Sequence, residues 1–192
     1  RWKLFHDYYD VIYRREKERG TPFSAILGSY EPDIHWIHRH TGWLLHQRNA
    51  AVGRTDARLT HEEFERIVDS RLQSSGHEDA TKRGELVKTI RSAATDRLVL
   101  LVGNTEKAIG FEIRSLQEFM AAEHFFDGGE TCVQKTLHAI APDPYWRNVF
   151  LFAAGRIFFE RQELIDSVSA VCGEMNDDPN DLAQQTILSG SR

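Results

Sequence analysis

One segment, FEIRSLQEFMAAEHFF at 111–126, changes its hydrophobic period halfway along. Its first residues alternate between apolar and polar side chains, as in a strand, and the later residues repeat their apolar side chains at helical spacing. Ser115 and Glu118 lie three residues apart at the change, and this spacing predicts a capping box that begins a helix. We therefore expect an extended segment that turns directly into a helix.

The preceding residues predict a compact unit around this junction. Apolar runs at 97–102 and 108–113, separated by the turn GNTEK, predict a β-hairpin. Before the hairpin, Thr60 and Glu63 form another expected capping box at the start of a helix, and a further helix is expected at 80–94. Two helices, a hairpin and a helix in this order are typical of a winged helix, which we assign to residues 59–128.

Helical periodicity also marks both flanks of this unit. The expected helices lie at 2–19, 33–47, 131–140, 145–159 and 161–174, and residues 21–33 are expected to be a connector. The fold class is therefore predicted to be mainly α, with a winged helix flanked by helical segments. We divide the chain into a helical segment at 1–58, the winged helix at 59–128 and a helical domain at 129–192.

Charge, cysteine content and hydrophobicity argue against a nucleic-acid-binding protein and against a membrane protein. The chain has 192 residues, a net charge of −5 and a pI near 6.0, which does not favour nucleic-acid binding by the whole molecule. Cys132 and Cys172 are interpreted as buried thiols in a reducing cytoplasm. The apolar run at 149–159 is too short to span a membrane. Because the chain begins with Arg and enters a helix at once, we expect a fragment of a longer cytoplasmic protein.

Motifs that carry catalytic chemistry are absent from the sequence. There is no phosphate-binding loop, no nucleophile elbow and no C-x-x-C pair, so we predict no catalytic residue in this chain. His35, His38 and His46 share one predicted helix, but a metal site needs more ligands and a second shell. We interpret them as residues at the boundary of the core and predict no metal site.

The predicted helix at 80–94 is basic. Residues 82–97 carry five cations against two acids, a net charge of +3. In a winged helix this position belongs to the recognition helix, so possible nucleic-acid contacts are Lys82, Arg83, Lys88 and Arg91. The preceding helix has a net charge of −3 over 62–69, which opposes phosphate binding. A solvated face or a protein contact is therefore favoured over a DNA contact.

The order of these motifs resembles the region after the nucleotide-binding core in NACHT-type members of the STAND class of signalling NTPases. In that family a helix ending in Arg-Arg-Glu, similar to 4–19, precedes a winged helix and a Trp-rich helix similar to 145–158. The strand–helix junction of the family reads roughly F-x-H-x-S-F-Q-E-[FY]-x-A-A. The matching residues here are Phe111, Ser115, Gln117, Glu118, Phe119, Ala121 and Ala122. The resemblance covers roughly residues 2–160.

The resemblance implies that the bound nucleotide switches the parent protein between an inactive and an active state. ATP or ADP with Mg²⁺ would bind in a core that precedes this chain, so the parent protein would be an ATPase while this part binds no cofactor itself. ATP would release the winged helix, and the protein would form homo-oligomers and activate an effector, commonly in antiphage defence. The expected partners are the nucleotide-binding core, sensor and effector parts of the same polypeptide, without nucleic acid or membrane.

One position departs from the family pattern. The family histidine that senses the nucleotide phosphate is replaced by Ile113, which neither donates a hydrogen bond nor carries charge. Arg114 is the remaining candidate for nucleotide sensing, although an adjacent side chain on a strand points to the other face. The substitution favours mechanical coupling over nucleotide contact at this junction. Two alternatives stay open: a DNA-binding winged-helix transcriptional regulator with helical dimerisation flanks, and a helical interaction module without a switch.

Overall fold

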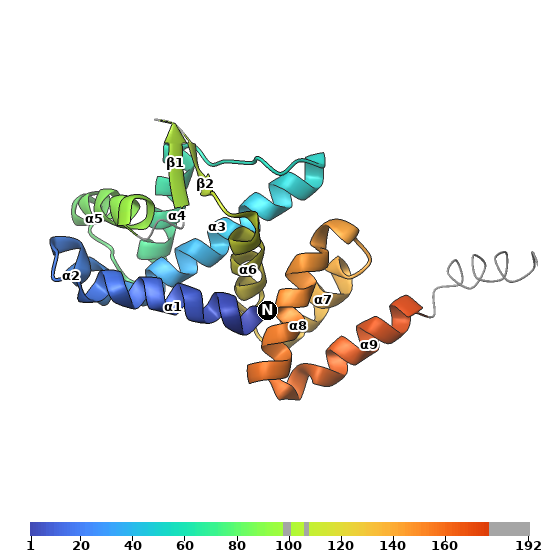
Figure 1. The fold of residues 1–192 in the computed structure, drawn as a ribbon. Coiled ribbons are helices and arrows are strands. Elements are labelled where there is room, and N and C mark those ends of the chain that lie inside the picture. Colours follow the sequence, from blue (N-terminus) through green and yellow to red (C-terminus); the bar gives the residue numbers. More distant parts are fainter. Residues whose placement is uncertain (98–100, 106–107, 177–192) are drawn as a thin grey trace, which may run out of the picture.

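The computed structural model describes residues 1–97, 101–105 and 108–176. The protein is mainly helical, as predicted, and its elements are arranged around one short helix in the centre (Figure 1). The helices are α1 (Trp2–Glu18), α2 (Pro22–Ser29), α3 (Glu31–Val52), α4 (His61–Ser74), α5 (Ala80–Ser92), α6 (Arg114–His124), α7 (Glu130–Ile140), α8 (Arg147–Glu160) and α9 (Ile165–Asn176). The strands are β1 (Leu101–Thr105) and β2 (Ala108–Phe111).

The central helix is α6, which lies between α3 and α8 (Figure 1). Its residues from Leu116 to Glu123 are all buried, and its most extensive contact is with α3. Gly42 of α3 makes this contact close, because a Cβ atom at that position would lie 2.6 Å from the Met120 Cβ and 3.0 Å from the Gln117 carbonyl oxygen. Only a residue without a Cβ lets the two backbones approach this far.

A small antiparallel sheet stands at one end of α6. β1 pairs with β2 in a register that places Leu101 opposite Phe111. Leu59, just before α4, forms a bridge to Ile109 of β2, with its amide donating to the Ile109 carbonyl at 2.8 Å and its carbonyl accepting at 2.7 Å. Residues 98–100 of the first predicted strand, and Glu106 and Lys107 of the predicted turn, lie outside the described residues. The second strand ends at Phe111, two residues earlier than predicted.

The predicted capping boxes have different outcomes. Thr60 caps α4 as predicted, accepting from the Glu63 amide at 3.1 Å while Glu63 accepts from the Thr60 amide at 2.8 Å. The prediction for Ser115 is wrong, because the N-cap of α6 is Ile113, two residues earlier. Ser115 is thus already inside the helix, where its side chain cannot cap the first amides. Glu118 instead pairs with Arg114 one turn back.

The connector predicted at 21–33 is also wrong, because residues 22–29 form α2. Pro22 stands at its first position and Thr21 forms a capping box with Ser24. Both features favour a helix start, and the predicted connector did not take this capping into account. α3 is longer than predicted and ends at Gly53, which has a φ of 63°. α3 belongs to the predicted segment 1–58, yet it packs mainly on α6 across the predicted boundary.

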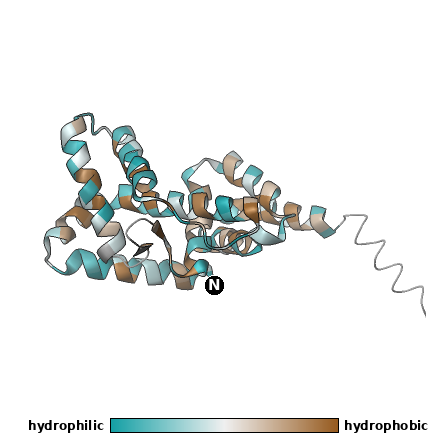
Figure 2. Cartoon of the chain, turned by 90° about the horizontal axis from the view of Figure 1, so that it is seen from above, coloured by the Kyte–Doolittle hydropathy of each residue, from teal (hydrophilic) through white to brown (hydrophobic). Residues whose placement is uncertain are grey.

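Apolar and polar residues alternate around most helices, as Figure 2 shows. In α7, Val133, Leu137 and Ile140 face the core at helical spacing. Cys132 lies beside this stripe on the outer face and is exposed, as is Cys172 of α9, so the prediction of buried thiols is wrong. Among the described residues, none of the helices has the length and apolar composition that a membrane crossing requires.

Candidate functional site at the central helix

Two buried carboxylates mark the two ends of α6. The exposed fraction is 1% for Glu118, near its start, and 9% for Glu123, near its end. A buried carboxylate is costly unless it is paired and hydrogen-bonded, so the partners of these two residues define what α6 is attached to.

At the start of α6, Arg114 and Tyr145 link this helix to two other segments of the chain. The Arg114 Nε donates to Glu118 Oε1 at 3.0 Å, and the Arg114 guanidinium lies 5.3 Å from the centre of the Tyr145 ring. The Tyr145 hydroxyl in turn donates to the Arg54 carbonyl oxygen at 2.7 Å. The junction between β2 and α6 is therefore joined to the turn before α8 and to the segment after α3.

His46 of α3 packs against the same place. Its ring centre lies 4.9 Å from that of Tyr145 and 4.5 Å from the Trp146 ring, and the residue is fully buried. Burial, together with the nearby Arg114 cation, lowers the pKa of His46 from 6.5 to about 4. His46 is therefore neutral at pH 7 and acts here as an aromatic packing group.

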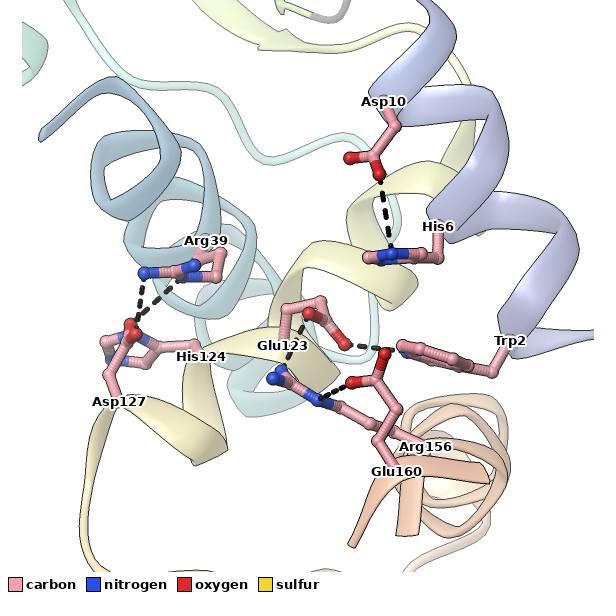
Figure 3. A network of polar contacts seen from close by, with 9 residues as sticks. All are labelled: Trp2, His6, Asp10, Arg39, Glu123, His124, Asp127, Arg156 and Glu160. Carbon is pink, nitrogen blue, oxygen red and sulfur yellow. Dashed lines mark hydrogen bonds and ion pairs between the residues drawn. The ribbon is translucent and has the colours of Figure 1, made fainter. Parts of the chain in front are cut away.

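At the end of α6, Glu123 accepts hydrogen bonds from two other helices (Figure 3). Trp2 Nε1 of α1 donates to Glu123 Oε1 at 2.7 Å, and Arg156 Nη1 of α8 donates to Glu123 Oε2 at 2.8 Å. Burial raises the pKa of Glu123, and the Arg156 cation opposes that shift. Arg156 also pairs with Glu160 at 3.4 Å and stacks over Phe126 at 4.3 Å. One carboxylate thus joins α1, α6 and α8.

The turn after α6 is joined to α3 by a neighbouring ion pair, also drawn in Figure 3. Arg39 Nη2 lies 2.7 Å from Asp127 Oδ1, and His124 Nδ1 lies 3.1 Å from Asp127 Oδ2. A polar cavity of about 150 Å³ lies between these two sets of contacts and is lined by Arg39, Glu123 and Arg156 among others. The charged side chains around this cavity already pair with one another, so their role is to join the helices that carry them.

The histidines of α3 lie deeper than predicted. His35 is half-buried, but His38 and His46 are fully buried, so the prediction of boundary positions is wrong for these two. His38 Nδ1 lies 3.0 Å from the Tyr9 hydroxyl, and burial lowers the pKa of His38 to about 3. Within the described ranges, no group of three or more His, Cys, Asp or Glu side chains is arranged to hold a metal ion.

The predicted nucleic-acid contacts on α5 are all engaged by acids. Arg83 Nε lies 2.6 Å from Asp69 Oδ1, and Arg91 Nη1 lies 2.5 Å from Glu65 Oε1, so both arginines pair with α4. The two lysines form ion pairs with acids three residues earlier in the chain, Lys82 with Asp79 at 3.7 Å and Lys88 with Glu85 at 3.2 Å. These pairs reduce the positive potential that a phosphate backbone would meet.

The junction residues that carry the resemblance are mostly buried together. Phe111, Gln117, Glu118 and Phe119 are each 3% exposed or less, and Ser115 is half-buried. Ile113 differs from them, since it is 51% exposed. The side chain of Arg114 is 47% exposed even though it pairs with Glu118.

Sequence reasoning missed the network around Glu123. None of Trp2, Glu123 and Arg156 was predicted as a site residue. One signal was available, because each of these charges interrupts an apolar run, MAAEHFF for Glu123 and VFLFAAGRIFF for Arg156. A charge inside an apolar helix face needs a partner of opposite charge, and these two residues are partners.

Scans against protein-family models, curated proteins and solved structures found no match to this chain.

Proposed function

We propose that this chain is the regulatory winged-helix and helical portion of a NACHT-type STAND ATPase of the cytoplasm. In this proposal the parent protein binds ATP or ADP with Mg²⁺ in a separate core. The chain described here carries the nucleotide state to homo-oligomerisation and to an effector, in a defence response against phage.

The order and pairing of the elements support the winged-helix part of the proposal. α3, the residue Leu59, α4, α5, β1 and β2 follow one another along the chain, and Leu59 pairs with the outer edge of β2. Residues 59–128 thus hold two helices, a hairpin and a further helix in sequence, with Leu59 paired to the hairpin, and this order supports the winged helix proposed for them.

The observation that carries the proposed role is the attachment of α6 at both ends. Glu118 and Arg114 hold its start against Tyr145, and Glu123 holds its end against Trp2 and Arg156. Such paired buried charges favour one arrangement of α1, α6 and α8, so the hairpin and these helices are expected to move as one body. A body of this kind transmits a change at a neighbouring nucleotide site.

In this proposal Arg114 acts chiefly as a coupling residue. Its Nε donates to the Glu118 carboxylate, which is buried and therefore needs this cation as its partner. Ile113 lies beside it with half of its surface exposed and can neither donate a hydrogen bond nor carry charge.

The test uses the full polypeptide that contains this chain. We expect mass photometry to show a larger assembly with ATP than with ADP. A Glu123→Leu, Arg156→Met variant replaces the buried pair by apolar side chains of similar size, which keeps the fold while removing the polar connection. This variant is expected to bind ATP normally and to lose the ATP-dependent increase in mass.

A matched control changes an exposed pair, with Arg161→Met and Glu163→Leu, and is expected to behave as the wild type. Absence of ATP binding by the full polypeptide, or equal masses with ATP and ADP, would overturn the proposed function.

A further inference from the structure

α1 presents an apolar ridge to the outside. Leu4, Tyr8 and Val11 are 69%, 48% and 61% exposed, whereas the opposite face of the helix is buried against the rest of the molecule. The three exposed side chains follow one another at spacings of four and three residues, so they form one line along the helix. Arg15, four residues further on, continues this line with its apolar stem. Spacings of four and three residues are those of the seam between two paired helices.

Four charged side chains accompany this ridge on one of its sides. Lys3 and Asp7 belong to the first half of α1, Arg14 and Glu18 belong to the second half, and all four are exposed. With about 3.6 residues per turn, they project to the same side of the ridge. The order of their charges is positive, negative, positive, negative. A copy of the same helix that runs in the opposite direction therefore places an opposite charge beside each of them.

Two of these four side chains have no charged partner within one copy. Lys3 pairs with Asp7, one turn later in the helix. Arg14 and Glu18, in contrast, form no ion pair with any residue of the chain that the structure describes. The second half of the ridge thus offers one cation and one acid to a partner.

The other charged side chains of α1 are engaged in their own copy. Arg15 and Arg19 both pair with Glu16, at 3.2 Å and 2.9 Å. The remaining contacts are Arg1 with Asn148 at 3.0 Å, His6 with Asp10 at 3.4 Å and Lys17 with Glu31 at 2.6 Å. These contacts leave the alternating charges beside the ridge to decide which helix fits against it.

We propose that two copies of this chain pair through the α1 ridge, with their helices antiparallel and related by a two-fold axis. Arg14 of each copy then meets Asp7 of the other, and Glu18 of each copy meets Lys3 of the other. The same surface of both copies is used, so the contact closes on itself and gives a dimer that does not grow further.

The apolar side chains fit the same arrangement. Tyr8 of one copy lies beside Val11 of the other at the centre, where each Val11 also contacts its counterpart. Leu4 then reaches a hollow of about 290 Å³ on the second half of the other ridge. This hollow is lined by Val11, Arg14, Arg15, Glu18 and Arg19. Positions 11, 14, 15 and 18 have the spacing of the four residues that receive one side chain of a facing helix.

This dimer needs no nucleotide. Its use as an interface in the oligomerisation step of the proposed function rests on that function. A test on the 192-residue chain without nucleotide therefore separates the two proposals, since its failure leaves the ATP-driven switch untouched. Because the apolar contact is limited to a few side chains of each copy, the dimer is expected to be weak and reversible.

The first test is sedimentation velocity of the chain at concentrations up to about 1 mM. We expect the 22.1 kDa monomer to convert reversibly to a dimer and to no larger species. Val11→Glu places two acids at the centre of the contact and is expected to weaken the dimer about tenfold or more. Val52→Glu, at another exposed position, is the matched control and is expected to behave as the wild type. A wild-type chain that stays monomeric, or that assembles beyond a dimer, would overturn the proposal.

Charge exchange tests the antiparallel pairing itself. Asp7→Arg opposes the cation at position 14 of the other copy, and Arg14→Asp opposes the acid at position 7. Each variant alone is therefore expected to dimerise about fivefold more weakly than the wild type. In an equimolar mixture each position 7 faces a position 14 of opposite charge, so a mixed dimer of wild-type affinity is expected.

The control for this exchange is Glu85→Arg, which changes an exposed acid of α5 and is expected to leave the dimer unchanged. Both ridge substitutions are at exposed positions, so the fold is expected to persist. A mixture that associates no more tightly than the two variants alone would show that the helices do not pair in this way.

A disulfide across the axis gives a second readout. Val11→Cys, in a chain whose native Cys132 and Cys172 are changed to serine, is expected to form a covalent dimer under mild oxidation, because the two copies of position 11 lie side by side. Val52→Cys in the same background is expected to give a much lower yield. Equal yields from the two chains would contradict the proposed contact.

Discussion

α6 and α5 both carry charged side chains, but their partners differ. Glu123 of α6 bonds to Trp2, which is 121 residues away, and to Arg156, which is 33 residues away. Arg83 and Arg91 of α5 bond to α4, the preceding helix, at separations of 14 and 26 residues. The first set joins distant parts of the fold, and the second joins neighbours along the chain.

This difference means that α6 connects several helices of the fold, whereas the charged side chains of α5 connect it to one neighbouring helix. Loss of a contact on α6 affects several helices, because α1, α3 and α8 all pack on it. Loss of a contact on α5 affects the α4–α5 pair, where the side chains are closer to solvent and ion pairs contribute less.

The largest effect is expected from Phe119→Ala in α6. Phe119 is 1% exposed and packs against Phe5 and Phe152, so its removal leaves a cavity bounded by three helices. We expect a loss of about 3–5 kcal/mol in the free energy of unfolding, measured by urea denaturation. Leu86→Ala in α5, at a half-buried position, is the matched change and is expected to cost less. Equal losses would remove the distinction between the two helices.

A smaller effect is expected from Glu123→Ala. The change leaves the Arg156 guanidinium with its longer ion pair to Glu160 and its stack on Phe126, without the short charged partner, so we expect a loss of about 3 kcal/mol in the free energy of unfolding. Glu123→Leu combined with Arg156→Met is expected to recover most of this loss, because no unpaired charge remains. A double-mutant cycle by chemical denaturation measures the coupling. Additive single losses would show that the two residues do not act as a pair.

Acid is expected to destabilise the packing of α3 against α1 and against the turn before α8. The pKa of His46 is lowered to about 4 and that of His38 to about 3, whereas both are near 6.5 in the unfolded chain. The unfolded state therefore binds the protons first, so stability is complete above pH 6.5 and falls as the pH drops towards 4. Each such proton contributes a slope of about 1.4 kcal/mol per pH unit.

The measurement is urea denaturation at pH 7, 6 and 5 for the wild type and for His46→Gln. The variant is expected to have the shallower dependence of stability on pH. Its slope relative to the wild type is the relevant quantity, since the substitution also changes the stability at pH 7. An unchanged slope would mean that His46 is not held neutral by burial.

The smallest effect is expected on the α5 face. Lys82 and Lys88 are exposed and pair with acids one turn away, so Lys82→Gln with Lys88→Gln is expected to change stability by less than about 0.5 kcal/mol. A gel shift at low salt with a random duplex is expected to show no binding by the wild type. Binding that disappears when Lys82, Arg83, Lys88 and Arg91 are all neutralised would instead support the DNA-binding alternative.

The sequence predicted the helical class and most helix positions because apolar spacing and capping residues act locally. The Thr60 capping box is one example, since both partners lie within four residues. The N-cap of α6 was predicted two residues too late, because the helix includes Arg114, whose partner Glu118 is buried by tertiary packing. Local spacing does not reveal that burial.

The candidate site was less predictable for the same reason. Phe111 and Phe119 were found from the pattern around the junction, but the network at the other end of α6 joins residues 2, 123 and 156. No local rule brings such distant positions together. The exposed cysteines were missed because the number of cysteines in a chain does not indicate which helix face they occupy.

The contact of Trp2 with Glu123 and with α8 has a consequence for the order of events on the ribosome. A Cβ atom on Gly155 would lie 2.9 Å from the Trp2 Cβ, so the first residues of α1 reach their place only after α8 has been made. At ordinary rates of translation this takes on the order of ten seconds. During that time Trp2 lacks the surface of α8 that covers it in the folded protein and is open to chaperones.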